Sequence, residues 1–360
     1  MHALTRSLLV AFVSLILAST AQLQPVFTTP RVSPAAGVTQ RIGITDVTIN
    51  YHRPAVKERT VWGELVPNGL APSTFGNQKP MPWRAGANEN TTITFAHDVR
   101  VEGQTLAAGT YGLHMIPSEA EWTIIFSKNT TSWGSFFYEE SEDVLRVTVT
   151  PVADPPQEWL EYDFEELTKT SAVAYLSWAG KKVPFKIEVD TDALVVQQMR
   201  NELRSVAGFG AQGYRQAASY CLANNINHDE ALSWIDTAIQ RNPDFQSRIV
   251  KAQLLAQIGN QTEADKIEKE ALDGGNEVAI NLYGYQLMGN QNLAKAIEIF
   301  KLNAKRYPDS WNVYDSLGEA YSNNSETEKA IKNYKTALSK APENQKERIK
   351  GILAKLESTN

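Results

Sequence analysis

The chain has 360 residues, an ordinary apolar content for a globular protein and a formal net charge of −6. Its length allows two domains, and it has no basic stripe that would neutralise phosphates, so nonspecific binding to nucleic acid or to anionic membranes is disfavoured. Cys221 is the single cysteine, which excludes an internal disulfide and a cysteine-based metal site.

The N-terminus has the pattern of a secretory signal. Arg6 supplies a positive charge, residues 8–18 form an apolar run, and Ser19-Thr20-Ala21 is a small-residue cleavage site. The apolar run is short for a membrane span, although an uncleaved anchor is the alternative. Because no cysteine lies beside the site, lipid attachment through one is excluded. We expect residues 1–21 to be removed and the mature chain, from Gln22, to be periplasmic or secreted without a membrane span.

Short runs of alternating apolar and polar residues predict strands over residues 34–190. Val47, Ile49 and Tyr51 share one face of the run 47–51, as in a half-buried strand. Turn residues separate such runs, and this spacing predicts an all-β antiparallel sandwich or jelly-roll-like barrel. The other runs are residues 91–96, 110–116, 122–127, 143–150, 159–167, 172–178 and 182–189.

A long irregular segment, residues 54–90, interrupts the strands, and a loop of this length is often functional. Five candidate residues in and around it include two arginines, which match a planar anion, and a tryptophan, whose face packs against a sugar or a cation. They predict a site for a carboxylate, a phosphate or a sugar. The alternative is a structural lock, in which the glutamate of the set pairs with one of the arginines. The candidates are Arg53, Trp83, Arg84, Asn88 and Glu89.

His114 is a further candidate for this site. The alternation in residues 110–116 places it on the polar face, off the main core, where it would line a groove. With His52 and His97 it makes three histidines without ligand spacing, so neither a metal site nor a cofactor is predicted.

The acidic residues give weak signals for catalysis. Glu161 and Asp163 share the polar face of one run, where paired carboxylates could serve a glycosidase, although a solvent-facing position is the simpler interpretation. The acidic run 139–143 matches no calcium-loop spacing. The sequence has no nucleophile elbow, phosphate loop or zinc-protease motif, so no catalytic residue is predicted.

Several short motifs in a fixed order carry a resemblance over residues 34–190. The set resembles the bacterial domain-of-unknown-function family 2911. That resemblance implies a secreted bacterial domain, often followed by helical repeats, and it implies no particular chemistry. The motifs are Ile49-Asn50-Tyr51-His52-Arg53-Pro54, Val61-Trp62-Gly63, Trp83-Arg84-Ala85-Gly86-Ala87-Asn88-Glu89, Ala108-Gly109-Thr110-Tyr111-Gly112-Leu113, Ile116-Pro117, Glu121-Trp122-Thr123 and Trp133-Gly134.

A connecting helix is predicted over residues 191–211, since apolar residues recur at helical spacing after Asp190 or Thr191, either of which can cap it. Gly208 and Gly210 would end it before the next domain. Its apolar stripe is Leu194, Val195, Met199, Leu203 and Val206.

The chain then repeats itself over residues 212–357. The unit that starts at Trp311 has small and aromatic residues at the spacing of a tetratricopeptide unit, and the region resembles that family. Earlier units start at Gln212, Gln246 and Glu277, and the second is degenerate. The amphipathic segment 344–356 would cap an all-α solenoid. The matching residues of the last unit are Tyr314, Leu317, Gly318, Tyr321, Ala330, Tyr334, Ala337 and Pro342.

One face of each first helix is expected to line the concave groove of this solenoid. Tyrosine and asparagine there favour a neutral extended peptide, and the two acidic residues favour a basic end on that peptide. The alternative is that the groove packs against the β-domain. The groove candidates are Gln216, Tyr220, Asn281, Tyr285, Asp315 and Glu319.

Three functional hypotheses follow. In the first, the protein is a noncatalytic envelope protein whose repeats recruit a protein or peptide and whose β-domain binds a small ligand or glycan. In the second, it is a periplasmic hydrolase with its site around Arg53, Arg84 and Glu89. In the third, it is a purely structural two-domain unit. The lack of a recognisable nucleophile or metal set favours the first.

Overall fold

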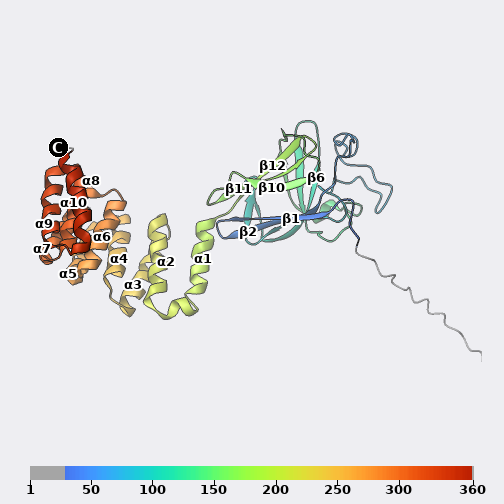
Figure 1. Ribbon diagram of the computed structural model, residues 1–360. Coiled ribbons are helices and arrows are strands. Elements are labelled where there is room, and N and C mark those ends of the chain that lie inside the picture. Colours follow the sequence, from blue (N-terminus) through green and yellow to red (C-terminus); the bar gives the residue numbers. More distant parts are fainter. Residues whose placement is uncertain (1–28, 359–360) are drawn as a thin grey trace, which may run out of the picture. The chain divides into compact units, whose positions relative to one another are not determined.

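The computed structural model describes residues 29–358 (Figure 1). The chain divides into two compact units, with the boundary between Val189 and Asp190. The N-terminal unit is built from strands and the C-terminal unit from helices. The predicted leader, residues 1–21, lies outside the described residues.

Six antiparallel strands form the first sheet of the N-terminal unit, in the order β1-β2-β3-β6-β7-β8. The alternating sequence of β2 reflects its two faces. Val47, Ile49 and Tyr51 point into the core and are buried, whereas Asn50 is exposed. The strands are β1 (Ala35–Ile42), β2 (Thr45–His52), β3 (Thr91–Phe95), β6 (Gly109–Ile116), β7 (Trp122–Ser127) and β8 (Asp143–Val149).

The second sheet is also antiparallel, with the order β10-β11-β12-β4-β5, and the short strand β9 pairs with β12 beside this path. Two of its hairpins turn through successive residues with positive φ: Ala179 at 46° and Gly180 at 78°, and Glu102 at 48° and Gly103 at 75°. Two such residues in succession match the twist of the flanking strands. The strands are β4 (Val99–Val101), β5 (Gln104–Leu106), β9 (Val152–Ala153), β10 (Glu161–Glu165), β11 (Ser171–Trp178) and β12 (Lys181–Glu188).

Side chains of the two sheets meet in the core. Tyr51 of β2 and Tyr162 of β10 have ring centroids 4.9 Å apart, and the Tyr162 amide donates to the Tyr51 hydroxyl at 3.1 Å. Phe126 of β7 and Phe185 of β12 are 6.3 Å apart. The prediction of an all-β antiparallel domain is confirmed, and every predicted run overlaps a strand. Within residues 29–189, neither strand path closes on itself.

The long segment 54–90 contains no extended strand, but tryptophans fix it to both sheets. Trp62 and Trp83 belong to the segment, Trp122 to β7 and Trp178 to β11. The Trp83 and Trp178 rings are stacked with centroids 6.1 Å apart, and Trp62 meets Trp122 edge-on at 4.9 Å. Large aromatic rings in such contacts bury extensive apolar area and hold one geometry. Trp62 and Trp83 of the segment therefore pack against both sheets.

The C-terminal unit contains the predicted helix pairs, and the second, degenerate unit forms a pair like the others. The helix pairs follow one another at about the 34-residue length of a tetratricopeptide unit. The prediction of an all-α solenoid is confirmed. The pairs are α2 (Ala211–Asn224) with α3 (His228–Arg241), α4 (Phe245–Gln257) with α5 (Gln261–Gly274), α6 (Glu277–Gly289) with α7 (Leu293–Arg306), and α8 (Trp311–Asn323) with α9 (Thr327–Lys340), followed by α10 (Glu343–Ser358).

The segment before the repeats differs from the predicted helix over residues 191–211. Helix α1 (Thr191–Glu202) is shorter, and a separate 3₁₀ turn covers Val206–Phe209. Val196 is the residue of α1 that is buried with the first repeat, while Val206 is exposed. The helix ends early because Leu203 closes its last turn and the chain then becomes extended at Ser205.

Small residues let the helices of a pair approach closely. A Cβ added at Gly318 would lie 3.0 Å from the Tyr334 ring, and Ala330 is fully buried. At the end of the stack, Ile349 and Leu353 of α10 are buried in the same apolar cluster. Helix α10 thus covers the apolar surface that the last pair would otherwise expose, as a capping helix does.

The close contact at Ala330 is testable. Ala330→Leu should lower the free energy of unfolding by about 1–3 kcal/mol, because the added carbons have no space between α8 and α9. Urea denaturation followed by far-UV circular dichroism measures this. Lys332→Leu, at an exposed position of the same helix, is the matched control and should change little. Equal effects at the two positions would contradict the packing.

Candidate functional site

Arg53 leaves the end of β2 and binds the neighbouring sheet. Its Nε donates to the carbonyl of Leu160 at 2.8 Å, and its Nη2 donates to Glu161 Oε2 at 2.9 Å. Gln157 also donates to that carboxylate oxygen, at 3.1 Å. The charge of Arg53 is therefore balanced within the protein. Glu161, which the sequence suggested as one half of a carboxylate pair, is engaged with Arg53.

Glu89 makes a different ion pair from those considered in the sequence. Arg31 Nη1 lies 2.7 and 2.6 Å from its two carboxylate oxygens, and His52 Nε2 lies 3.3 Å from one of them. The hydrogen bond from Arg31 lowers the pKa of Glu89. Glu89 therefore does lock the segment, but its partners are Arg31 and His52, and both Arg53 and Arg84 bond elsewhere.

Arg84 follows Trp83 and is held over an aromatic ring. Its Nη1 donates to the carbonyl of Asn88 at 2.9 Å, and its Cζ lies 5.0 Å from the centre of the Phe136 ring. Gly134 leaves room for the guanidinium, since a Cβ there would collide with it. Burial lowers the pKa of Arg84. Within residues 29–358, Arg84 forms no ion pair with a carboxylate.

The turn after Arg84 depends on two residues with positive φ, Ala85 at 51° and Asn88 at 60°. Asparagine tolerates this conformation, and the Asn88 side chain donates to the carbonyl of Ser33 at 3.1 Å. The backbone of Trp83 exchanges two hydrogen bonds of 2.8 Å with Met115 of β6. These contacts place Arg84 next to the first sheet, beside β6.

His114 of β6 is buried, with 2% of its surface exposed, and does not line an open groove as expected. Its Nδ1 lies 2.9 Å from Ser135 Oγ, and its ring meets Tyr138 edge-on at 5.5 Å. The cause is the segment that contains Ser135 and Tyr138, which covers the second face of β6. Burial, followed by the positive charge of Arg84, lowers the pKa of His114 to about 4. The imidazole is thus neutral at neutral pH.

The sequence-predicted site residues therefore fall into separate groups. Arg53 belongs with Glu161, Glu89 with Arg31 and His52, and Arg84 is near His114. A hydrolase site in this region would need Arg53, Arg84 and Glu89 to converge. In the structure these three side chains do not contact one another.

A pocket of about 380 Å³ lies beside Arg84. Two further cations, Lys57 and Arg59, line it with Trp83 and Trp178, and its lining contains no Asp or Glu. Sequence reasoning missed Lys57 and Arg59 because an irregular segment has no period from which to read the direction of a side chain. A pocket with three cations and no carboxylate attracts anions.

No group of three or more His, Cys, Asp or Glu residues within residues 29–358 is arranged to hold a metal ion. Cys221 is buried in the first repeat, and burial raises the pKa of its thiol. Raised pKa values disfavour the thiolate, so Cys221 behaves as a packing residue.

In the repeats, several groove candidates bond to neighbouring helices. The Tyr220 hydroxyl donates to Asp192 of α1 at 2.8 Å, and the Tyr285 hydroxyl donates to Glu319 of α8 at 2.8 Å. Gln216 is exposed. These bonds tie α2 to α1 and α6 to α8, and they fix the side chains of Tyr220 and Tyr285.

The acid proposed for a basic peptide end is already paired. Asp315 accepts two hydrogen bonds from Arg348 Nη2 of α10, at 3.0 and 2.9 Å. Asn281 is nine-tenths buried, and its Oδ1 has no hydrogen-bond partner. Of the two acidic groove candidates, Asp315 is therefore paired with Arg348, and Glu319 accepts a hydrogen bond from the uncharged Tyr285 hydroxyl.

Residues 33–187 match the family model described as "Protein of unknown function (DUF2911)". The resemblance of the N-terminal unit to this family is confirmed. The match covers most of the two-sheet unit and includes Arg84, His114 and the tryptophan cluster. No curated protein matches the sequence significantly.

Two solved structures of other proteins resemble part of the chain. MamA from Desulfovibrio magneticus RS-1 is 19% identical, with 41% of this chain and 84% of that chain covered and a TM-score of 0.27. PilF from Pseudomonas aeruginosa is 17% identical, with 43% and 71% covered and a TM-score of 0.28. Scores this low carry no argument about function, so the assignment of repeats rests on the helix pairs themselves.

The buried His114 predicts a pH dependence of stability. Its pKa is about 4 in the folded protein and about 6.5 in the unfolded chain, so the unfolded state binds more protons between these values. Stability should therefore fall as pH is lowered from about 6.5 to about 4, by a few kcal/mol at most. His114→Gln should flatten this part of the profile. Unfolding free energies of both proteins across this range measure it, and parallel profiles would contradict the assignment.

Proposed function

We propose that the protein is a noncatalytic binding protein with two binding modules. The repeats serve as a scaffold for a protein or peptide partner, and the β-domain binds a small ligand or glycan. The proposed scaffold role of the repeats rests on one observation. Val278 and Leu282 of α6 are 63% and 55% exposed and lie one helical turn apart, among the groove candidates Asn281 and Tyr285. An exposed apolar pair on a polar surface favours a docking role.

Hydrogen bonds between successive first helices support this proposal. Tyr285 of α6 is bonded to Ser316 and Glu319 of α8, and Gln286 of α6 donates to Gln253 of α4 at 3.4 Å. A surface whose side chains are already fixed loses little conformational entropy on binding. The geometry therefore suits an extended segment that lies across several first helices.

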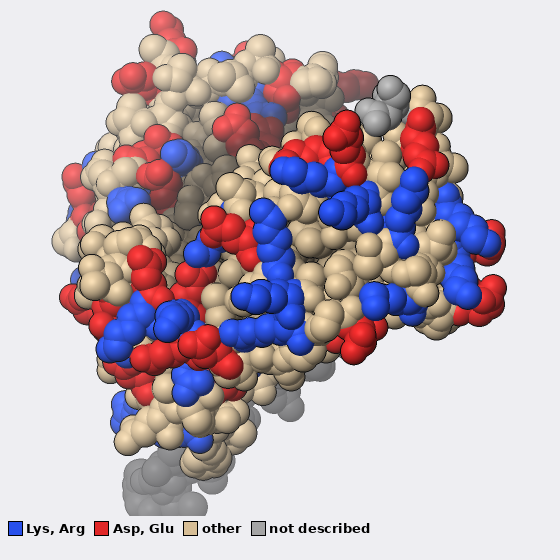
Figure 2. Space-filling model, turned by 90° about the vertical axis from the view of Figure 1, so that its left-hand side faces the viewer, with Lys and Arg blue, Asp and Glu red and all other residues tan. Residues whose placement is uncertain are grey.

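The distribution of charge supports a protein partner over a nucleic acid. In the face shown in Figure 2, Lys and Arg are interspersed with Asp and Glu, and no broad area carries one sign. Nucleic-acid binding needs a continuous basic surface that displaces counterions. A mixed surface of this kind is common at protein–protein interfaces and their rims.

The hydrolase alternative has no such support. It requires Arg53, Arg84 and Glu89 to act on one substrate, but Arg53 is bound to Glu161 and Glu89 is bound to Arg31. A binding role also needs fewer converging groups than catalysis does.

We further propose that the protein is exported. The support is the charged, apolar and small-residue order of residues 1–21. None of the helices within residues 29–358 has the length and apolar character of a membrane span. N-terminal sequencing of protein from the envelope fraction tests this proposal. A chain that starts at Gln22 is expected, and a chain that retains Met1 would contradict it.

The docking role of α6 can be tested by site-specific crosslinking. A photoreactive residue at position 282 should give a discrete adduct in producing cells, because a partner would cover this side chain. The adduct should be lost when Val278→Glu is added, since a charge one turn away disrupts an apolar contact.

Position 258 provides the matched control, because Ile258 is an exposed aliphatic residue of the same unit at the end of α4. The same adducts at positions 258 and 282, or adducts that are insensitive to Val278→Glu, would show that α6 is no docking surface.

A further inference from the structure

The guanidinium of Arg84 is a partly buried positive charge without a counter-charge. It donates to the Asn88 carbonyl and lies over the face of Phe136, both of which are uncharged. His114, the neighbouring titratable group, is neutral at neutral pH because burial and Arg84 itself depress its pKa. Removing a charge from water is costly, and buried charges in proteins are normally paired. An unpaired one indicates that a partner is supplied from outside.

Two other cations line the same pocket, and they too form no ion pair with a carboxylate among the described residues. Arg59 donates to the carbonyls of Ala55 and Val56, at 2.5 and 3.0 Å, which orients its guanidinium. The backbone amide of Lys57 donates to Glu158, but Glu158 does not line the pocket. Lys57, Arg59 and Arg84 thus give this pocket a positive charge that its own lining leaves unbalanced.

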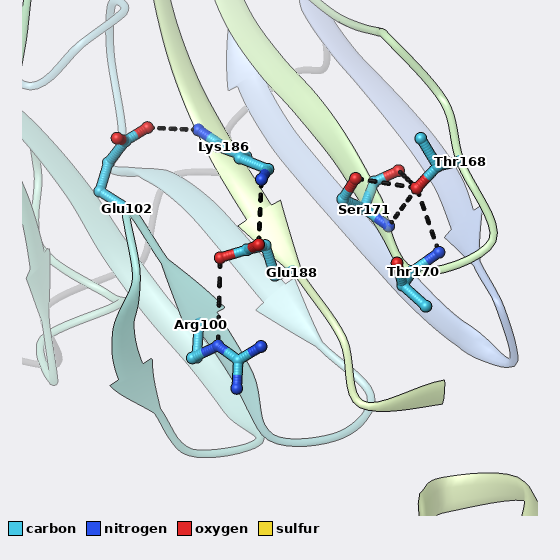
Figure 3. A network of polar contacts seen from close by, with 7 residues as sticks. All are labelled: Arg100, Glu102, Thr168, Thr170, Ser171, Lys186 and Glu188. Carbon is cyan, nitrogen blue, oxygen red and sulfur yellow. Dashed lines mark hydrogen bonds and ion pairs between the residues drawn. The ribbon is translucent and has the colours of Figure 1, made fainter. Parts of the chain in front are cut away.

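A second cavity of the same domain shows the opposite arrangement. It is a hollow of about 570 Å³ on the second sheet, lined by lysines and glutamates. There Lys182 pairs with Glu165 at 2.8 Å and Lys186 with Glu188 at 3.0 Å. Figure 3 shows Lys186 and Glu188 on β12, with Arg100 of β4 on the other side of Glu188. The two lysines that line this hollow are thus paired with carboxylates, whereas the three cations that line the pocket beside Arg84 are not.

We propose that the pocket beside Arg84 binds the oxyanion group, a carboxylate or a phosphate, of a small molecule. The anion supplies the missing counter-charge, and a guanidinium offers two parallel donors that match either group. The rest of the molecule lies against the apolar lining, where Trp83 and the half-exposed Leu65 are found. The inference rests on the proposed ligand-binding role of the β-domain and names the class of ligand.

Inorganic phosphate is the first probe, titrated into the full chain by calorimetry at constant ionic strength. Wild type should bind it, and Arg84→Met should bind about tenfold or more weakly, because a charge-assisted hydrogen bond is lost. Arg84→Lys keeps the charge without the fork and should lie between the two. Arg41→Met is the matched control. Arg41 lies on β1 and is paired with Asp46, so binding should be unchanged.

Thermal melting of each variant confirms that it is folded before titration. Equal phosphate affinity in wild type and Arg84→Met would overturn the proposal, as would a wild type that binds neither phosphate nor the carboxylate probe described below. Weaker binding in Arg41→Met as well as Arg84→Met would also overturn it, since that pattern indicates general surface charge.

A second probe pair separates the sources of the oxyanion. Galacturonate carries a carboxylate on a sugar ring, and galactose is its neutral counterpart. Tighter binding of galacturonate than of galactose, lost in Arg84→Met, identifies a carboxylate ligand, whereas binding of phosphate alone identifies a phosphate ligand. Equal binding of both sugars, unaffected by Arg84→Met, would overturn the oxyanion inference and leave the proposed ligand-binding role of the β-domain standing.

Discussion

The arrangement of the N-terminal unit depends on the contact of four tryptophans. Trp122 and Trp178 come from different sheets, and Trp62 and Trp83 come from the segment between β2 and β3. Each ring buries a large apolar area, and stacked or edge-on pairs add about 0.5–1.5 kcal/mol beyond that burial. The cluster therefore joins both sheets and gives an otherwise irregular segment one conformation.

The position of Arg84 follows from this cluster. Trp83 is fixed by its ring contacts and by its backbone bonds to β6, so the next residue has little freedom. Phe136 and Gly134 then receive the guanidinium in a partly dry place. Holding a charge there without a carboxylate partner costs free energy of folding, because the guanidinium is partly removed from water. Such costs are expected where a protein binds something.

The local patterns in the sequence were sufficient to predict the repeats and most strands. Tetratricopeptide units are short and contact mainly their neighbours, so their spacing is visible in the chain itself. Strand β1 gave no clear signal, because it is an edge strand whose residues, apart from Ile42, remain at least partly exposed. Strands β4 and β5 are too short for alternation to be recognised.

The candidate site was harder to predict, for two physical reasons. Arg53 and Glu161 lie on segments far apart in the chain, as do Glu89 and Arg31, and no local pattern records such pairings. Alternation placed His114 on a polar face, but both faces of β6 are buried because the segment containing Ser135 covers the second one. Residue type alone made Arg84 a candidate, and only the structure shows that its charge is unpaired.

The most direct test of this account is the stability of Arg84→Met in a buffer without phosphate or carboxylate. Methionine keeps much of the side chain's volume and removes the charge. An unpaired guanidinium held for a ligand predicts a free energy of unfolding within about 1 kcal/mol of wild type or above it, since relief from burying a charge offsets the lost contacts. A loss of about 3 kcal/mol or more would show that Arg84 is a structural residue, and it would contradict the account.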